Sequence, residues 1–263
     1  MNVMTKVPRR SGMRLTEKTM FTNSKQRDGV WSHLPEDGGH GMHVMIGTES
    51  FGPVDISLFR KEEIAHLPSA TLWMKRAVDI VLSAVSLLLL SPFFLLIALA
   101  IRLCDGGPAL FSQRRVGHKG VEFTLYKFRS MHLSSEADGI PQLCRSDDDR
   151  LTVVGRFIRN HHLDELPQLW NVLRGDMSFV GPRPERRYFV EQIRAINPDY
   201  DRLYLLRPGL FSHATLYNGY TDTMEKMLER LRMDLDYLDN RSIWLDSKIF
   251  FLTVFAILTG KKF

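Results

Sequence analysis

The sequence predicts an α-dominated α+β fold with a re-entrant membrane helix and interfacial amphipathic helices. Three observations lead to this fold class. Residues 80–101 form a 22-residue stretch without a charged side chain, residues 121–128 alternate between apolar and polar side chains, and residues 163–173 and 224–258 show helical periodicity.

Length and composition set the outer limits. The chain has 263 residues, enough for one catalytic-sized domain and an appendage, and 44% hydrophobic with 25% charged residues exclude a wholly disordered chain. The net charge of +5 is mild, so it suits an anionic ligand or a membrane surface without requiring nucleic acid. The two cysteines, Cys104 and Cys144, lack metal-ligand spacing, which excludes a disulfide framework and a structural zinc site.

Residues 1–70 differ from the remainder of the chain. They are rich in Gly, Ser, His and Asn, and their basic start leads into no apolar run. We therefore expect a mostly flexible N-terminal extension without a cleavable secretory signal, and solvated histidines rather than a metal site. The other predicted boundaries are a membrane helix at 71–104 and a catalytic domain with C-terminal interfacial helices at 105–263.

The uncharged stretch is long enough to cross a membrane, but its middle contains a helix breaker. A helix of 22 residues spans the ~30 Å hydrocarbon core of a bilayer at about 1.5 Å per residue. Pro92 removes one backbone hydrogen bond at the centre, and Ser91 can bond a carbonyl that this releases. Ser91 and Pro92 therefore mark the predicted break in the membrane helix.

The charges on both sides of this helix favour re-entry over a crossing. Lys75 and Arg76 precede it and Arg102 follows it, whereas a crossing helix normally has its basic residues on one side. A helix that enters, bends and leaves on the same face fits these flanks. A spanning helix and a buried core helix remain the alternatives.

The remaining elements follow from local patterns. Residues 121–128 predict a half-buried strand, and 163–173 predict a helix that Gly175 ends as a C-cap. Residues 224–238 predict an amphipathic helix. The apolar run at 249–258 is too short to span a bilayer, so it should pack in the core or lie at the interface. The three aspartates at 147–149 predict a solvated loop rather than a metal site.

Asp164 and Glu165 are the candidate reactive residues. They stand at a predicted helix start, where backbone N–H groups favour an ionised acid that could serve as a nucleophile or a metal ligand. An ordinary helix cap explains the same pair when it is considered alone.

The arginines that follow change the context of this pair. Seven arginines and no lysine occur from Arg174 to Arg207, and Arg183 stands between two prolines that restrict its turn. Arginine binds phosphate oxygens in bidentate fashion, so the set suits a diphosphate site, and a hard ligand such as Glu165 suits Mg²⁺. A membrane helix beside such a site suggests a lipid phosphate as one substrate.

Six motifs in order resemble the bacterial sugar transferase family, the monotopic polyprenyl-phosphate phosphoglycosyltransferases, over residues 71–263. The motifs are KRAVD at 75–79, SP at 91–92, QRRVG at 113–117, YKFRSM at 126–131, DELPQLWN at 164–171 and GDMSFVGPRP at 175–184.

The resemblance implies an enzyme at the cytoplasmic face of the bacterial inner membrane that initiates surface polysaccharide or glycan synthesis. It implies that Asp164 attacks the β-phosphate of a UDP-sugar, that UMP leaves, and that polyprenyl (undecaprenyl) phosphate takes the sugar 1-phosphate from the aspartyl intermediate. It assigns the Mg²⁺ ligand to Glu165. Positions tied to substrate binding by the resemblance are Lys127, Arg159, Arg183, Arg207 and, as a weaker match, Asp234.

One segment departs from the family pattern. Residues 211–219 read FSHATLYNG where many members carry a Thr-Gly and a Gln, so the sugars of better-known members are not transferred to this chain. His161 and His162 precede Asp164, and we expect packing or substrate contact from them because an ionised carboxylate needs no base to attack.

The predicted partners are a UDP-sugar, polyprenyl phosphate and the lipid bilayer, with no nucleic acid, and a homodimer is a compatible assembly. Two rival functions stay open. One is a membrane-anchored Mg²⁺-dependent phosphodiesterase of nucleotide sugars, and the other is a non-enzymatic membrane scaffold. A bitopic anchor for a nucleic-acid-binding domain is poorly supported by the modest charge.

Overall fold

The computed structural model describes residues 69–135, 141–143, 148–219 and 221–259. The predicted extension at 1–70, with its histidines, lies outside the described residues except for Ser69 and Ala70. Helices predominate in the described part, as predicted. The elements in chain order are α2 (Ser69–Asp105), β1 (Leu110–Val116), η2 (His118–Gly120), β2 (Glu122–Phe128), α3 (Val153–Asn160), η3 (Leu163–Glu165), α4 (Gln168–Arg174), β3 (Ser178–Val180), α5 (Arg187–Ile196), η4 (Pro198–Leu205), β4 (Gly209–Phe211), α6 (His213–Asn218), α7 (Met224–Asp239) and α8 (Ile243–Thr259).

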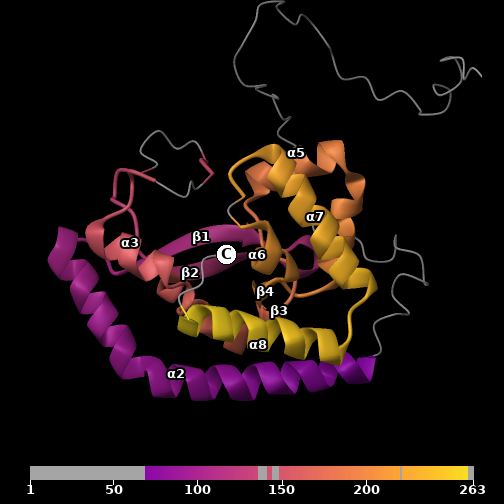
Figure 1. Ribbon diagram of the computed structural model, residues 1–263, viewed down its shortest axis with the longest axis horizontal. Helices are drawn as coiled ribbons and strands as arrows, with labels where there is room; N and C mark the ends of the chain where they lie inside the picture. Colours follow the sequence, from indigo (N-terminus) through magenta and orange to yellow (C-terminus); the bar gives the residue numbers. More distant parts are fainter. Residues whose placement is uncertain (1–68, 136–140, 144–147, 220, 260–263) are drawn as a thin grey trace, which may run out of the picture. The chain divides into compact units, whose positions relative to one another are not determined.

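Helix α2 contains Pro92 and stays helical through it. The predicted break is therefore a bend: Figure 1 shows α2 as two arms that meet at an angle. We attribute the bend to Pro92, since proline lacks the N–H that would bond the Leu88 carbonyl. The Ser91 hydroxyl donates to that carbonyl at 2.8 Å, which satisfies it as predicted.

Most of α2 is exposed although it is strongly apolar. Among the described helices, α2 over Thr71–Asp105 is long and apolar enough to cross a membrane, and only 11% of its most apolar window is buried. A core helix of a water-soluble domain would bury that window, so these exposed side chains need a different apolar environment.

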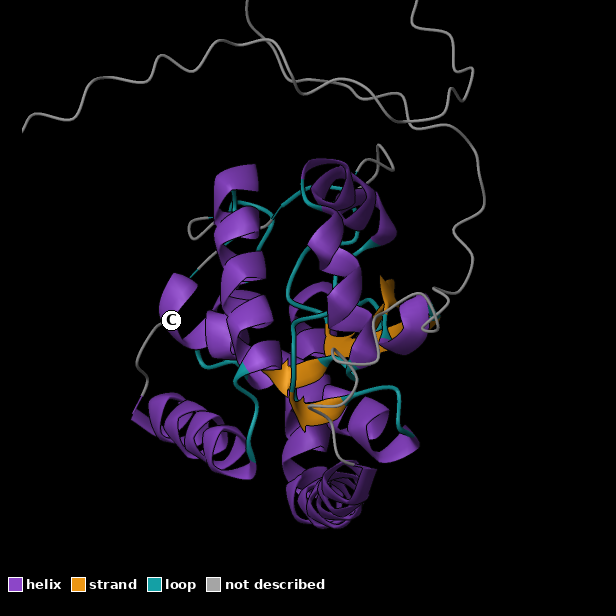
Figure 2. Ribbon diagram, turned by 90° about the vertical axis from the view of Figure 1, so that its right-hand side faces the viewer, coloured by secondary structure: helices purple, strands orange, loops and turns teal. Residues whose placement is uncertain are grey.

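Within the described residues the strands form two small sheets, and Figure 2 shows helices on more than one side of them. Strands β1 and β2 are an antiparallel hairpin in which Phe111 is opposite Lys127. The alternation predicted at 121–128 is confirmed, because Phe123 and Leu125 are buried while their neighbours are partly exposed. Strands β3 and β4 pair in parallel, with Ser178 opposite Gly209.

Asn171 joins helix α4 to the hairpin. Its side chain is fully buried, accepts from the Tyr126 N–H at 3.1 Å and donates to the Thr124 carbonyl at 2.7 Å. These bonds pair two backbone groups on the free edge of β2 and fix the position of the strand relative to α4. Gly175, at φ 97°, ends α4 as the predicted left-handed cap.

Helix α8 lies beside the first arm of α2 (Figure 1). The Lys75 ammonium is 2.6 Å from the Asp246 carboxylate, which also accepts from the Tyr237 hydroxyl at the end of α7. One side of α8 is buried through Ile249, while bulky side chains such as Phe255 on another side are exposed. Both predicted locations of this apolar run therefore apply, since one side packs in the core and another remains free for an interface.

Of the aspartates predicted as a solvated loop, Asp149 is exposed as predicted, whereas Asp148 is not. Asp148 is buried and accepts from the Arg150 guanidinium at 2.5–2.7 Å, so the prediction is wrong at this position. The pairing explains why a carboxylate is tolerated there. Residues 144–147 lie outside the described part of the chain.

Candidate active site

Asp164 and Glu165 lie on a separate 3₁₀ turn, η3, rather than in the first turn of a longer helix. His162 precedes the turn with a left-handed backbone at φ 55°, and helix α4 starts only at Gln168, after Pro167. A non-glycine residue in this conformation costs about 1 kcal/mol or more, and such residues cluster at functional sites. The turn buries Asp164 to 6% exposure.

Glu165 is held between two cations that come from distant segments. The Lys127 ammonium on β2 is 2.6 Å from Oε1, and the Arg183 guanidinium bonds both carboxylate oxygens. Burial raises the pKa of Glu165, but the positive charges of Arg183 and Lys127 outweigh it and hold this pKa well below its ordinary value. Glu165 is therefore ionised throughout the neutral range.

Asp164 has the opposite electrostatic balance. Burial raises its pKa to about 6, with a further rise from the neighbouring Glu165 charge, while Lys127, Arg159 and Arg183 oppose the shift. Our expectation that the helix start keeps this acid strongly ionised is corrected, because desolvation is the largest effect and α4 begins beyond the turn. Asp164 is still mostly ionised at pH 7, but as an anion with little hydration.

The turn that carries Arg183 is fixed by several bonds. The Gly209 N–H donates to the Pro182 carbonyl at 2.9 Å, and a Cβ on Gly181 would lie 2.4 Å from the Arg207 carbonyl, so only glycine fits there. Glu185, just after the turn, is buried and lies 2.7 Å from both Arg115 and Arg230.

Sequence reasoning missed this last cluster. Burial alone would raise the pKa of Glu185, but the charges of Arg230 and Arg115 hold it at about 2. Its members come from β1, the turn and α7, and no local pattern indicates that they meet. The sequence does show one indication, which is that an acid, Glu185, directly follows the proline-bounded turn. A buried acid there would be destabilising without a cationic partner.

The arginine run does not gather at one place. Arg183 contacts Glu165, whereas other members pair elsewhere: Arg174 with Asp176, Arg187 with Glu122, Arg194 with Asp201 and Arg202 with Asp239. The expectation that the whole set forms one diphosphate site is therefore wrong.

The structure brings together some of the predicted site residues and separates others. Lys127, Arg159 and Arg183 all act on the Asp164 carboxyl. Arg207 instead donates to the Gly175 carbonyl at 3.0 Å and lines a small cavity with Ser178 and Val180. Phe179, between those two residues, lines the cavity beside Glu165, so Arg207 and Glu165 are on opposite sides of β3.

Asp234 lies behind the site rather than in it. It is 2% exposed and, like Asp164, is not among the residues that line the cavity beside Glu165, but unlike Asp164 it has no neighbour in sequence that lines it. Its carboxylate accepts from the Arg183 backbone N–H and lies 3.4 Å from the Ser212 hydroxyl. The structure thus connects Asp234 to the turn that carries Arg183.

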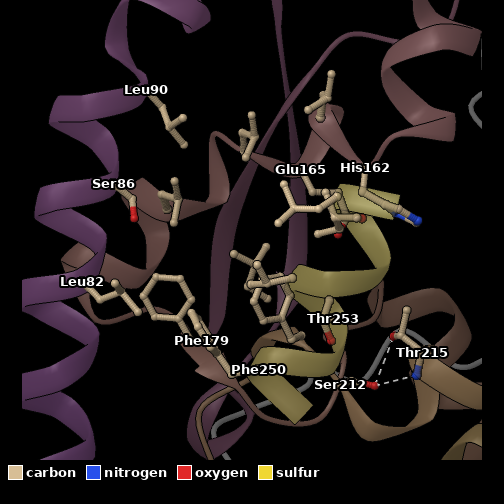
Figure 3. Close-up of a pocket in the computed structure, with 18 of the residues that line it drawn as sticks. Leu82, Ser86, Leu90, His162, Glu165, Phe179, Ser212, Thr215, Phe250 and Thr253 are labelled. Carbon is tan, nitrogen blue, oxygen red and sulfur yellow. Dashed lines mark hydrogen bonds between the residues drawn. The ribbon is translucent and has the colours of Figure 1, made fainter. Parts of the chain in front are cut away.

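A cavity of about 400 Å³ opens beside Glu165 (Figure 3). Its walls are mostly apolar and come from α2 and α8, with Leu82 and Leu90 on one side and Phe250 on the other. Polar groups gather near Glu165, where His162 and Arg183 also line it. An apolar space that ends at a charged cluster suits a ligand with a hydrocarbon part and an anionic head.

The segment that departs from the family pattern lines this cavity. Ser212, at the N-cap of α6, accepts from the Thr215 N–H at 3.1 Å, and Leu216 follows on the same short helix. Residues 211–219 therefore contribute both hydroxyl and apolar groups to the wall opposite α2 (Figure 3).

The carboxylates of this site could hold Mg²⁺ only together with oxygen atoms of a substrate. Over the described residues there is no group of three or more His, Cys, Asp or Glu side chains that would hold an ion alone. Two adjacent carboxylates, Asp164 and Glu165, are the hard oxygen donors that Mg²⁺ takes together with phosphate oxygens and water.

A comparison with known proteins identifies the family of the chain. The family model described as "Bacterial sugar transferase" matches residues 70–260. The chain belongs to the bacterial sugar transferase family. The motifs that resembled this family therefore identified it correctly.

Three relatives illustrate its similarities. A UDP-N-acetylgalactosamine-undecaprenyl-phosphate N-acetylgalactosaminephosphotransferase of Aeromonas hydrophila is 39% identical over 211 residues, covering 80% of this chain and 50% of the relative. A UDP-glucose:undecaprenyl-phosphate glucose-1-phosphate transferase of Escherichia coli (strain K12) is 45% identical over 190 residues, covering 72% of this chain and 41% of the relative. An exopolysaccharide production protein PSS of Rhizobium leguminosarum bv. phaseoli is 41% identical over 197 residues, covering 72% of this chain and 98% of the relative. This sugar transferase chain thus spans about half the length of the first two relatives.

The raised pKa of Asp164 predicts a stability cost at neutral pH. A carboxyl whose folded pKa lies above its unfolded value stabilises the protein below the unfolded pKa, near 3.8, and this contribution is lost as the pH rises to about 6. Asp164→Asn removes the buried charge, so we expect it to raise the free energy of unfolding by about 3 kcal/mol at pH 8 and to have little effect at pH 4.

Thermal unfolding in detergent at both pH values measures this difference. The exposed Asp236 on α7 gives a matched control, because Asp236→Asn should change the unfolding midpoint little at either pH. A loss of stability in Asp164→Asn at pH 8 would contradict the assignment of a desolvated anion.

Proposed function

We propose that this chain transfers a sugar 1-phosphate from a UDP-sugar to polyprenyl (undecaprenyl) phosphate through a covalent intermediate on Asp164, and so initiates surface polysaccharide or glycan synthesis. The observation that carries the proposal is the placement of Asp164, a buried and mostly anionic carboxylate, among cations and next to Glu165, which lines an apolar cavity together with Arg183. The names of the relatives, which act on UDP-sugars and undecaprenyl phosphate, support the same reaction.

In the first step, an Asp164 carboxylate oxygen attacks the β-phosphorus of the UDP-sugar. The bond between that phosphorus and the bridging oxygen breaks, and UMP leaves with the electron pair. Attack of an anion on an anionic diphosphate is opposed by charge repulsion, which Lys127, Arg159 and Arg183 reduce. The poor hydration of Asp164 leaves its oxygen ready to react.

In the second step, a phosphate oxygen of the lipid attacks the phosphorus of the aspartyl intermediate. The bond from Asp164 to phosphorus breaks, the electron pair returns to the carboxylate, and polyprenyl diphosphosugar is released. Hydrocarbon walls from α2 and α8 suit the isoprenoid chain, while Arg183 and Lys127 lie where its phosphate would arrive.

Mg²⁺, held by Glu165 with substrate phosphate oxygens, would neutralise developing negative charge. In this chain, Glu165 already orients Lys127 and Arg183. These residues thus bind and position the diphosphate, while the buried turn keeps water away from Asp164.

The proposed location is the cytoplasmic face of the bacterial inner membrane. The bent α2 and the exposed apolar side of α8 would enter one leaflet, which brings the cavity to the depth of the lipid phosphates. Single cysteines before Lys75 and after Arg102 should then react with an impermeant thiol reagent from the same side of the membrane. Labelling from opposite sides would contradict re-entry and indicate a spanning helix.

The reaction itself is tested by product analysis. Purified protein is incubated with a panel of UDP-sugars and Mg²⁺, with and without polyprenyl phosphate, and UMP and lipid product are followed. We expect lipid product only with polyprenyl phosphate, and Asp164→Asn should lower turnover by at least about 10³-fold because its amide cannot form the acyl phosphate.

Two results would overturn the proposal. Continuous release of sugar phosphate without lipid would indicate the phosphodiesterase, and an absence of turnover with every UDP-sugar would indicate a scaffold. Gln192→Glu on α5, away from the described site residues, serves as a handling control that should keep wild-type turnover.

A further inference from the structure

Helix α7 holds the turn that carries Arg183 at two points. Arg230 and Asp234 are four residues apart and lie on the same buried side of α7, at 6% and 2% exposure. The Arg230 guanidinium is 2.7 Å from Glu185, and the Asp234 carboxylate accepts from the Arg183 backbone N–H. One face of one helix therefore fixes the turn on both sides of Pro184.

Asp234 also connects this turn to the cavity wall. The Ser212 hydroxyl lies 3.4 Å from Asp234 Oδ1, and Ser212 is in turn the N-cap of α6. The charged side chains that act on Asp234 are those of Arg230 and Arg183. A single carboxylate thus joins α7, the Arg183 turn and the segment that begins at Ser212.

The buried position of Asp234 is energetically unfavourable for an ionised carboxylate. Burial raises the pKa of Asp234 to about 7, and the charge of Arg230 and the bonds from Arg183 and Ser212 do not fully offset this. A well-packed apolar side chain would often be at least as stable in such a position. The bonds that the carboxylate accepts are what distinguish it from an apolar replacement.

We propose that Asp234 is a positioning residue for the transfer reaction: it fixes the backbone of Arg183 so that the guanidinium reaches Glu165 and the substrate phosphates, and it touches neither substrate itself. This inference rests on the proposed function and replaces the substrate-binding role that the sequence predicted for Asp234. Arg183 bonds both oxygens of Glu165, so a small movement of its backbone would disturb the whole charge cluster.

Three variants of α7 test the proposal. Asp234→Ala removes both acceptors and should lower kcat/KM by about 10–100-fold, since a displacement of about 1 Å at a site has such effects. Asp234→Asn keeps an acceptor oxygen for the Arg183 N–H and should recover to within about threefold of wild type. Asp236→Ala, on the exposed side of the same helix, is the matched control and should retain wild-type turnover.

A double-mutant cycle separates positioning from general destabilisation. If Asp234 acts through Arg183, Asp234→Ala should lower kcat/KM by less than about twofold in an Arg183→Ala background. Losses that multiply fully in the double variant would overturn the proposal, as would an Asp234→Asn variant as impaired as Asp234→Ala. The latter result would mean that the charge or proton of Asp234 is itself used.

A measurement without substrates tests the positioning role of Asp234 separately from the proposed function. ¹³C-NMR titration of the carboxyl groups in nanodiscs reports the pKa of Glu165, which Arg183 lowers. Asp234→Ala should raise that pKa, and Asp236→Ala should not. An unchanged Glu165 pKa in Asp234→Ala overturns the positioning role whether or not the wild-type protein transfers a sugar phosphate.

Discussion

The ion cluster of Lys127, Glu165 and Arg183 is the interaction on which the site depends. Glu165 reaches both cations from a single 3₁₀ turn, with Lys127 delivered by β2 and Arg183 by the turn after β3. Each of these elements is held by further buried polar contacts, including those of Asn171 with β2 and of Glu185 with Arg115 and Arg230. If this cluster were loosened, Asp164 would be a buried carboxylate compensated mainly by Arg159.

The cluster makes two opposing requirements compatible. A nucleophilic carboxylate benefits from poor hydration, and burial gives Asp164 a pKa of about 6, but an isolated buried anion would be protonated at neutral pH. Nearby positive charge keeps it mostly ionised and also prepares the site for phosphate. The apolar cavity between α2 and α8 then adds a surface for hydrocarbon directly beside these charges. In the proposed function, membrane attachment and phosphate chemistry would therefore meet at one turn.

Local patterns in the sequence predicted the elements whose side chains interact mainly with their own neighbours. The alternation in β2, the amphipathic α7, the Gly175 cap and the bend near Pro92 all follow from such patterns. The motif around Asp164 identified the turn to which the proposed function assigns the reaction, but the pKa of Asp164 depends on burial that only the folded chain reveals. Distant pairings such as Glu185 with Arg230 were not predictable, because no periodicity relates them. The location of Arg207 relative to Glu165 was not predictable, since its side of β3 depends on the pairing with β4.

The central claim is that Asp164 becomes covalently phosphorylated during each cycle. The most direct measurement is mass spectrometry of the peptide that contains Asp164, after the protein has been incubated with its UDP-sugar in the absence of polyprenyl phosphate and quenched in acid. The account predicts an added mass of one sugar phosphate on Asp164, which disappears when polyprenyl phosphate is supplied before the quench. A peptide that stays unmodified while lipid product forms in the parallel complete reaction would contradict it.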